Sequence, residues 1–171
     1  MSTKWTIDPS HSEIQFKVKH MVISTITGAF EKFDSEISSE SDDFSNAHFS
    51  FSAEIDSINT KNIDRDNHLK SADFFDAEHF PRLTFSSEKG IEAGKISGIL
   101  EICGVQKEVT LDVDFGGVIN DPFGMVRAGF EISGRINRKD FGLSWSQLTE
   151  AGGLIVGDDI KISANVEFVK Q

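Results

Sequence analysis

Apolar and polar residues alternate with a period of two along most of the chain. Ile14, Phe16, Val18 and His20 share one face of such a segment, and the residues between them are charged or polar. This alternation is typical of a β-strand that buries one face. The same pattern marks further predicted strands, whose residues are 49–55, 83–85, 96–102, 109–115, 126–132 and 160–168.

Residues that favour turns separate these segments. We expect a bend or bulge at Gly28, inside a mixed segment at 22–38. Turns are expected at Lys89-Gly90, Cys103-Gly104, Gly116-Gly117, Asn120-Asp121-Pro122 and Gly157-Asp158. Many alternating strands with short connections predict an antiparallel sheet that closes or packs on itself. The length of 171 residues predicts a single domain over residues 1–171.

One stretch breaks the alternation and reads as helical. Within residues 60–80, Arg65, His68, Leu69 and Ala72 follow the spacing i, i+3, i+4, i+7 of one helix stripe. Pro81 then restarts an extended chain. The sequence therefore predicts one helix near residues 60–73, placed over one end of the sheet.

The charge and aromatic content narrow the classes of partner. The net charge is −11 and no basic stripe is visible along the sequence, so we expect no nucleic-acid partner and repulsion from anionic lipid surfaces. No run approaches the roughly 18 apolar residues of a membrane span, so no membrane insertion is expected. The chain has 15 Phe and no Tyr, a set that suits a dry core or an apolar cavity.

Signals for targeting, catalysis and metal binding are weak. No secretory signal precedes the first predicted strand, so a cytoplasmic protein is expected. A single cysteine, Cys103, excludes an internal disulfide and has no activating base nearby in sequence. The five histidines show no metal-ligand spacing. We therefore predict no metal, no cofactor and no catalytic residues.

Three polar residues sit on apolar faces and have two interpretations each. His20 is either a hydrogen-bonded core histidine or a ligand contact. Arg65 and His68 share their stripe with Leu69, so each needs a polar partner. That partner is either a neighbouring carboxylate such as Asp66 or Asp73, or a ligand head group at the mouth of a cavity.

The stretches WTIDPSHSEIQFKVKHMVISTITGAF near the start and VGDDIKISANVEF near the end enclose a more specific middle motif, Arg-Asp-x-His-Leu followed by Ser-x-Asp-Phe-Phe. In these stretches the chain resembles the YceI-like polyisoprenoid-binding family, and the resemblance spans nearly the whole sequence. The hairpin EICGVQKEV departs from the family pattern, in which a basic residue and a threonine-lysine-proline run are common.

The resemblance implies a lipocalin-like antiparallel β-barrel of about eight strands. It implies an apolar tunnel for a long-chain ligand, typically an isoprenoid or isoprenoid quinone, and homodimers are common in the family. Carried over to this sequence, the cavity-lining strand positions are Phe16, Val18, Phe49, Phe51, Leu100, Ile102, Phe115 and Phe130. The helix at the mouth and its continuation carry Arg65, Asp66, His68, Leu69, Phe74 and Phe75.

Three functions are consistent with these features of the sequence. A carrier or storage protein would bind the ligand through apolar burial alone. An enzyme would use Arg65, Asp66 and His68 for acid–base chemistry, and a cavity carboxylate beside His68 would favour it. The third is a stress-response or interaction protein whose barrel is filled by its own side chains.

Overall fold

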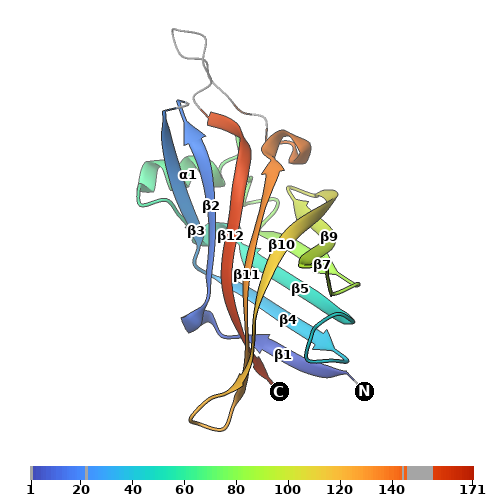
Figure 1. The fold of residues 1–171 in the computed structure, drawn as a ribbon. Coiled ribbons are helices and arrows are strands. Elements are labelled where there is room, and N and C mark those ends of the chain that lie inside the picture. The colour runs from blue at the N-terminus through green and yellow to red at the C-terminus, as the bar shows by residue number, and fades with distance from the viewer. Residues whose placement is uncertain (1, 22, 144, 146–155) are drawn as a thin grey trace.

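The computed structural model describes residues 2–21, 23–143, 145 and 156–171 of the chain. It consists mainly of long antiparallel strands with one short α-helix (Figure 1). In chain order the elements begin with β1 (Thr3–Ile7), η1 (Pro9–His11), β2 (Glu13–His20), β3 (Ser24–Phe30), β4 (Phe33–Ser39), β5 (Ala47–Glu54), η2 (Ile55–Ser57) and β6 (Ile58–Asn59). They continue with α1 (Ile63–Lys70), β7 (Arg82–Ser87), β8 (Ile91–Glu92), β9 (Lys95–Ile102), β10 (Val105–Asn120), β11 (Val126–Asn137), η3 (Arg138–Phe141) and β12 (Val156–Lys170).

Eight of the strands close a barrel. Their order is β1-β4-β5-β7-β9-β10-β11-β12, and β12 pairs back with β1 through Trp5↔Lys170. Higher along the same edge, β12 pairs with β2, and β3 and β6 extend the sheet beyond the ring. The expected antiparallel barrel of about eight strands is therefore confirmed.

The helix is shorter than expected. It spans Ile63–Lys70, where residues 60–73 were predicted, and turns follow it up to the start of β7. Asn62 caps its first turn by accepting a hydrogen bond from the Arg65 backbone N–H at 3.1 Å, and Ser71 ends it. Thr60 and Lys61 thus precede the cap, and the sequence pattern alone does not show that.

At three positions where glycine predicted a bend or a turn, the strand continues in the structure. Gly28 lies within the regular pairing of β3, opposite Phe16, so it is neither a bend nor a bulge. Gly116 and Gly117 lie inside β10, where the register with β11 shifts between Phe115 and Gly117. They form a β-bulge instead of a turn, because β10 continues to Asn120.

Gly157-Asp158 is the third, since it falls within β12 at a register shift against β2. The turn at Cys103-Gly104 is confirmed. Both residues have positive φ, 53° and 74°, as a two-residue hairpin of the primed type requires.

Aromatic side chains fill the end of the barrel that holds β1 and both chain termini, the lower end in Figure 1. Phe44 enters this end from the β4–β5 connection and is fully buried. Its ring centroid lies 5.2 Å from Trp5, 5.4 Å from Phe115 and 5.1 Å from Phe130. We call these four residues the lower aromatic cluster.

Candidate functional site: an apolar cavity

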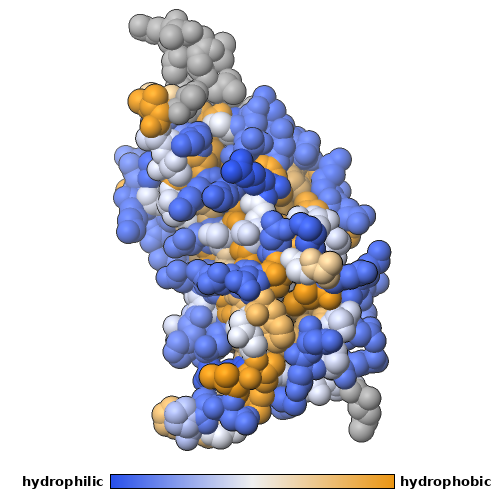
Figure 2. Space-filling view, viewed as in Figure 1, coloured by the Kyte–Doolittle hydropathy of each residue, from blue (hydrophilic) through white to orange (hydrophobic). Residues whose placement is uncertain are grey.

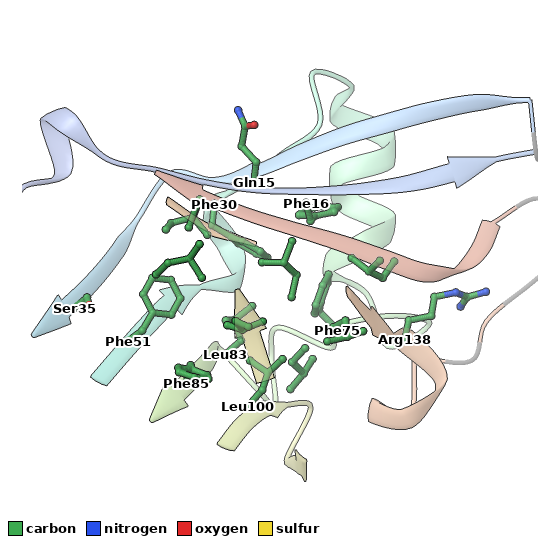
Figure 3. A pocket seen from close by; sticks show the side chains of 18 of the residues that line it. Gln15, Phe16, Phe30, Ser35, Phe51, Phe75, Leu83, Phe85, Leu100 and Arg138 are labelled. Atoms are coloured by element: carbon green, nitrogen blue, oxygen red, sulfur yellow. The ribbon is translucent and has the colours of Figure 1, made fainter. Parts of the chain in front are cut away.

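A cavity of about 200 Å³ occupies the barrel above the lower aromatic cluster. Phe49 and Phe168 form its floor, because each lines the cavity and also packs on Phe130, with ring centroids 6.1 and 5.8 Å apart. The walls come from the inward faces of the strands, and Leu69, Phe74 and Phe75 supply the side formed by α1 and the turns after it. Figure 3 shows these side chains converging from opposite walls.

Small residues on the walls keep the space open. Gly28 faces inward, and a Cβ built there would lie 2.3 Å from Cζ of Phe16. The ring of Phe16 therefore lies flat over the backbone of the neighbouring strand. A Cβ at Gly134 would likewise lie 2.4 Å from Cδ2 of Leu111. Both large side chains line the cavity, and the glycines let them fold back against its wall.

The polar groups at the wall are either hydrogen-bonded or turned away from the cavity. Ser35 donates a hydrogen bond to the Ser50 carbonyl at 2.6 Å. Gln15 borders the cavity, but its side chain points away from the apolar cluster in Figure 3. With these partners made, the described lining offers a ligand almost purely apolar contacts.

Arg138 closes the end of the cavity near η3 and was not foreseen from the sequence. It is 2% exposed, and burial lowers the pKa of its guanidinium. The guanidinium donates to the carbonyls of Gly157 at 2.9 Å, Leu143 at 2.6 Å and Trp145 at 2.7 Å. It thereby ties the chain after η3 to the start of β12, and no sequence motif signals this arrangement.

The structure places nine of the predicted ligand-contact residues on the cavity wall. They are Phe16, Val18, Phe49, Phe51, Leu69, Phe74, Phe75, Leu100 and Ile102. The same alternation carries further wall residues that were not singled out, among them Phe30, Phe85, Leu111, Ile132 and Ile162. The period-two alternation places all of these except Phe30 on the inward face, and Phe30 lies in the mixed segment 22–38.

Phe115 and Phe130 face inward as expected but do not line the cavity. Their rings stack on each other at 5.1 Å and pack against Phe44 in the lower aromatic cluster. His20 is half-buried near the end of β2, opposite Val156, and is also outside the lining. The alternation therefore shows that a residue faces inward, but it does not show how far along the barrel axis that residue lies.

The polar residues Arg65, Asp66 and His68 of α1 have partners just before and just after the helix, and none of the three lines the cavity. Arg65 donates to the hydroxyl and carbonyl of Thr60 at 2.8 and 2.6 Å, and Asp66 accepts from the Thr60 backbone N–H at 2.8 Å. His68 lies 2.9 Å from the exposed carboxylate of Asp73. A neighbouring carboxylate was thus a correct interpretation for His68, whereas the partner of Arg65 is Thr60.

Cys103 holds the turns after α1 against the β9–β10 hairpin. Its Sγ lies 3.5 and 3.3 Å from the carbonyl oxygens of Phe74 and Phe75. Burial raises the pKa of this thiol, which disfavours the reactive thiolate. Its role in the site is to position two wall residues.

A group of potential metal ligands lies away from the cavity. One ligand atom each of Asp8, His11 and Glu167 falls within 4.8 Å of the others. Arg127 donates to both carboxylates, at 2.9 Å to Asp8 and 2.8 Å to Glu167. The guanidinium already supplies the positive charge that a cation would bring.

Comparison with known proteins identifies the family. The YceI-like domain model matches residues 5–168. The chain belongs to the YceI-like family. A UPF0312 protein of Staphylococcus aureus is 40% identical over 167 residues, which cover 97% of both chains.

Solved structures of YceI-like and related proteins share the fold. A Campylobacter jejuni YceI protein is 34% identical, covers 90% of each chain and has a TM-score of 0.76. Burkholderia cenocepacia BcnA reaches a TM-score of 0.80 at 21% identity, covering 94% of this chain and 98% of its own. A polyisoprenoid binding domain from Saccharophagus degradans, implicated in plant cell wall breakdown, has a TM-score of 0.75 at 14% identity and covers 98% of each chain.

Proposed function

We propose that this YceI-like protein binds a long-chain apolar molecule in the barrel cavity, and carries or stores it. An isoprenoid or an isoprenoid quinone is the ligand class we favour. The observation that carries the proposal is the cavity itself, whose described wall is aliphatic and aromatic from the floor at Phe49 to the end at Arg138. The polyisoprenoid-binding domain among the structural neighbours supports the choice of ligand class.

Apolar burial alone can hold such a ligand. Each buried methylene contributes about 0.8 kcal/mol, so a chain of several isoprene units needs few polar contacts. The cavity of about 200 Å³ exceeds the roughly 150 Å³ dry cavity that takes up benzene. It is smaller than the roughly 300–1,000 Å³ of most ligand pockets, so we infer that wall side chains turn aside when a long chain enters.

The wall offers little for acid–base catalysis, which favours binding over chemistry. Arg138 is the one titratable side chain in the described lining, and its guanidinium is held by backbone carbonyls. Asp73, the partner of His68, is half-exposed and lies outside the lining. The carboxylate that would have favoured the enzyme hypothesis is therefore not at the cavity wall.

Solvent extraction of purified protein followed by mass spectrometry tests the proposal. Wild-type protein should carry a long-chain apolar molecule, or take up an isoprenoid quinone when offered one. Phe51→Arg places a charge on the cavity wall and should abolish binding and lower the free energy of unfolding. Ile99→Arg is the matched control, because Ile99 is 41% exposed on the outer face of β9 and its variant should bind normally.

Two outcomes would contradict the proposal. Wild-type protein that carries no lipid and has no affinity for isoprenoid quinones or long-chain amphiphiles would refute it. Undiminished binding by a folded Phe51→Arg variant would show that the ligand lies elsewhere.

A further inference from the structure

A row of cations crosses the outer face of three strands at the upper end of the barrel. Arg135 of β11 lies opposite Lys161 of β12, which lies opposite Lys17 of β2. All three are exposed, as is Lys19, two residues further along β2 on the same face. We call these four residues the basic patch. They are far apart in the chain, which is why no basic stripe was visible in the sequence.

Within the described residues, the basic patch forms no ion pair. Among the ion pairs within 4.0 Å in the described part of the chain, none involves any of its four residues. Asp159 is exposed on the same face beside Lys161, and the surface stays net positive. Like charges directly opposite each other destabilise a sheet. Such a row in a chain of net charge −11 indicates an anionic partner from outside.

The surface charge changes sign along the barrel. Four residues lower on the same strands, the corresponding row consists of Glu131, Asn165 and Glu13. The row between the two is uncharged and consists of Ser133, Ser163 and Gln15. At about 3.3 Å per residue the charged rows are about 13 Å apart. This exceeds the Debye length of about 8 Å at physiological ionic strength, so the upper end acts as a positive surface of its own.

An exposed apolar tip lies next to the basic patch. The β2–β3 hairpin extends past Lys19, and its described tip residues Met21 and Ile23 are 42% and 86% exposed. Figure 2 shows apolar surface at this upper end, with hydrophilic surface over the strands below it. Apolar side chains beside a basic surface are typical of segments that lie at the interface of an anionic bilayer.

We propose that the upper end of the barrel docks on an anionic lipid bilayer, with the basic patch on the phosphate head groups and Met21 and Ile23 in the interface. The exposed apolar tip favours a bilayer over a nucleic acid, whose phosphates would need only the cations. The basic patch lies on the outer side of the cavity wall. Val18 of β2 and Ile160 of β12, which pair with each other beside the patch, line the cavity on the inner side. Docking would thus bring the cavity to the lipid phase.

The opposite tip of the barrel lacks this combination. Ile119 and Phe123 at the β10–β11 hairpin are 64% and 87% exposed, so this tip is apolar as well. Arg127, which lies opposite Ile119, is bonded to Asp121 as well as to Asp8 and Glu167. The lower tip therefore provides a control for exposed apolar surface without free positive charge.

Co-sedimentation with lipid vesicles tests the proposal. The full chain should bind vesicles of phosphatidylcholine mixed with phosphatidylglycerol, and should not bind phosphatidylcholine alone. Raising the salt concentration should weaken binding. Lys17→Gln and Lys161→Gln should each lower the partition coefficient about fivefold, and Ile23→Ser should lower it further. Phe123→Ser and Lys4→Gln, which change exposed residues at the lower end of the barrel, should leave it unchanged.

Each variant is also checked for folding and for ligand. Lys161→Gln relieves like-charge repulsion and should not lower the melting temperature, so its loss of binding cannot reflect unfolding. No binding to either vesicle, equal binding to both, or full binding by the Lys17→Gln/Lys161→Gln double variant would overturn the proposal. Protein that carries or takes up a long-chain ligand but does not bind vesicles would refute docking alone. Protein that binds vesicles but neither carries nor takes up such a ligand would refute only the carrier function.

Discussion

The lower and upper halves of the barrel are built from the same alternating strands, yet one is packed and the other is hollow. In the lower half, Phe44 enters from a connection between strands and fills the centre against Phe115 and Phe130. In the upper half, inward positions such as Gly28 let a large neighbour fold back against the wall. Alternation thus fixes which side chains face inward, and the sizes of those side chains decide whether they meet.

The largest difference between the halves should appear on truncating Phe44. This ring is fully buried and packs on three aromatic neighbours within 5.4 Å, so Phe44→Ala should cost about 3–5 kcal/mol of unfolding free energy. Phe16→Ala should cost less, because one side of that ring already borders the cavity and lacks contacts. Urea unfolding of both variants measures the difference.

Ligand binding should respond in the opposite order. Phe44→Ala should retain the ligand at temperatures where it stays folded, since Phe44 does not line the cavity, whereas Phe16→Ala should change affinity. Equal stability losses for the two variants would show that the upper half is as tightly packed as the lower.

The second prediction concerns how the upper half stays hollow. Gly28→Ala places a Cβ about where the Phe16 ring now lies, and the ring must swing toward the cavity. Overpacking of this kind costs about 1–3 kcal/mol, and the displaced ring should reduce uptake of a long-chain ligand. Stability by urea unfolding and ligand content by mass spectrometry report the two effects.

Two further variants isolate the cause. Gly129→Ala is the matched control, since no atom lies within 4 Å of a Cβ built at that glycine, and it should bind normally. Adding Phe16→Ala to Gly28→Ala should restore uptake, because the two side chains share one space. If the double variant binds no better than Gly28→Ala, the ring of Phe16 is not what closes the cavity.

The strands could be predicted from the sequence because burial on one face imposes a period of two. Breaks within a strand could not be located in the same way. Gly116-Gly117 and Gly157-Asp158 look like turns, yet both lie in strands that continue through an irregular register. Glycine permits a turn and a bulge alike, and the pairing with the neighbouring strand selects between them.

The sequence predicts which residues face the barrel interior, but not how far along the barrel axis each of them lies. Phe51 and Phe130 both have the inward phase, but Phe51 lines the cavity and Phe130 belongs to the lower aromatic cluster. The position of Phe44 decides this, and it lies in a connection that carries no periodic signal. Arg138 and the basic patch could not be predicted from the sequence for a related reason. Their partners and neighbours come from distant segments of the chain.

The smallest expected effect is a pH dependence confined to the lower half. The side-chain contact with His11, together with Ser10 and Arg127, lowers the pKa of Asp8, and the contact with Asp8 raises the pKa of His11. The lowered carboxyl pKa gives stability that is present above the ordinary Asp value near 3.8 and is lost as the pH falls toward the folded value. The raised His11 pKa gives stability that is present below the ordinary value of 6.5 and is lost as the pH rises through the folded value.

Wild-type protein should therefore exceed His11→Gln in melting temperature at pH 5.5, and the difference should shrink by pH 8.5. Because His11 is exposed and the cavity lies in the other half, ligand content should be the same in both proteins at both pH values. A pH-dependent loss of ligand in His11→Gln would show that the two halves are coupled.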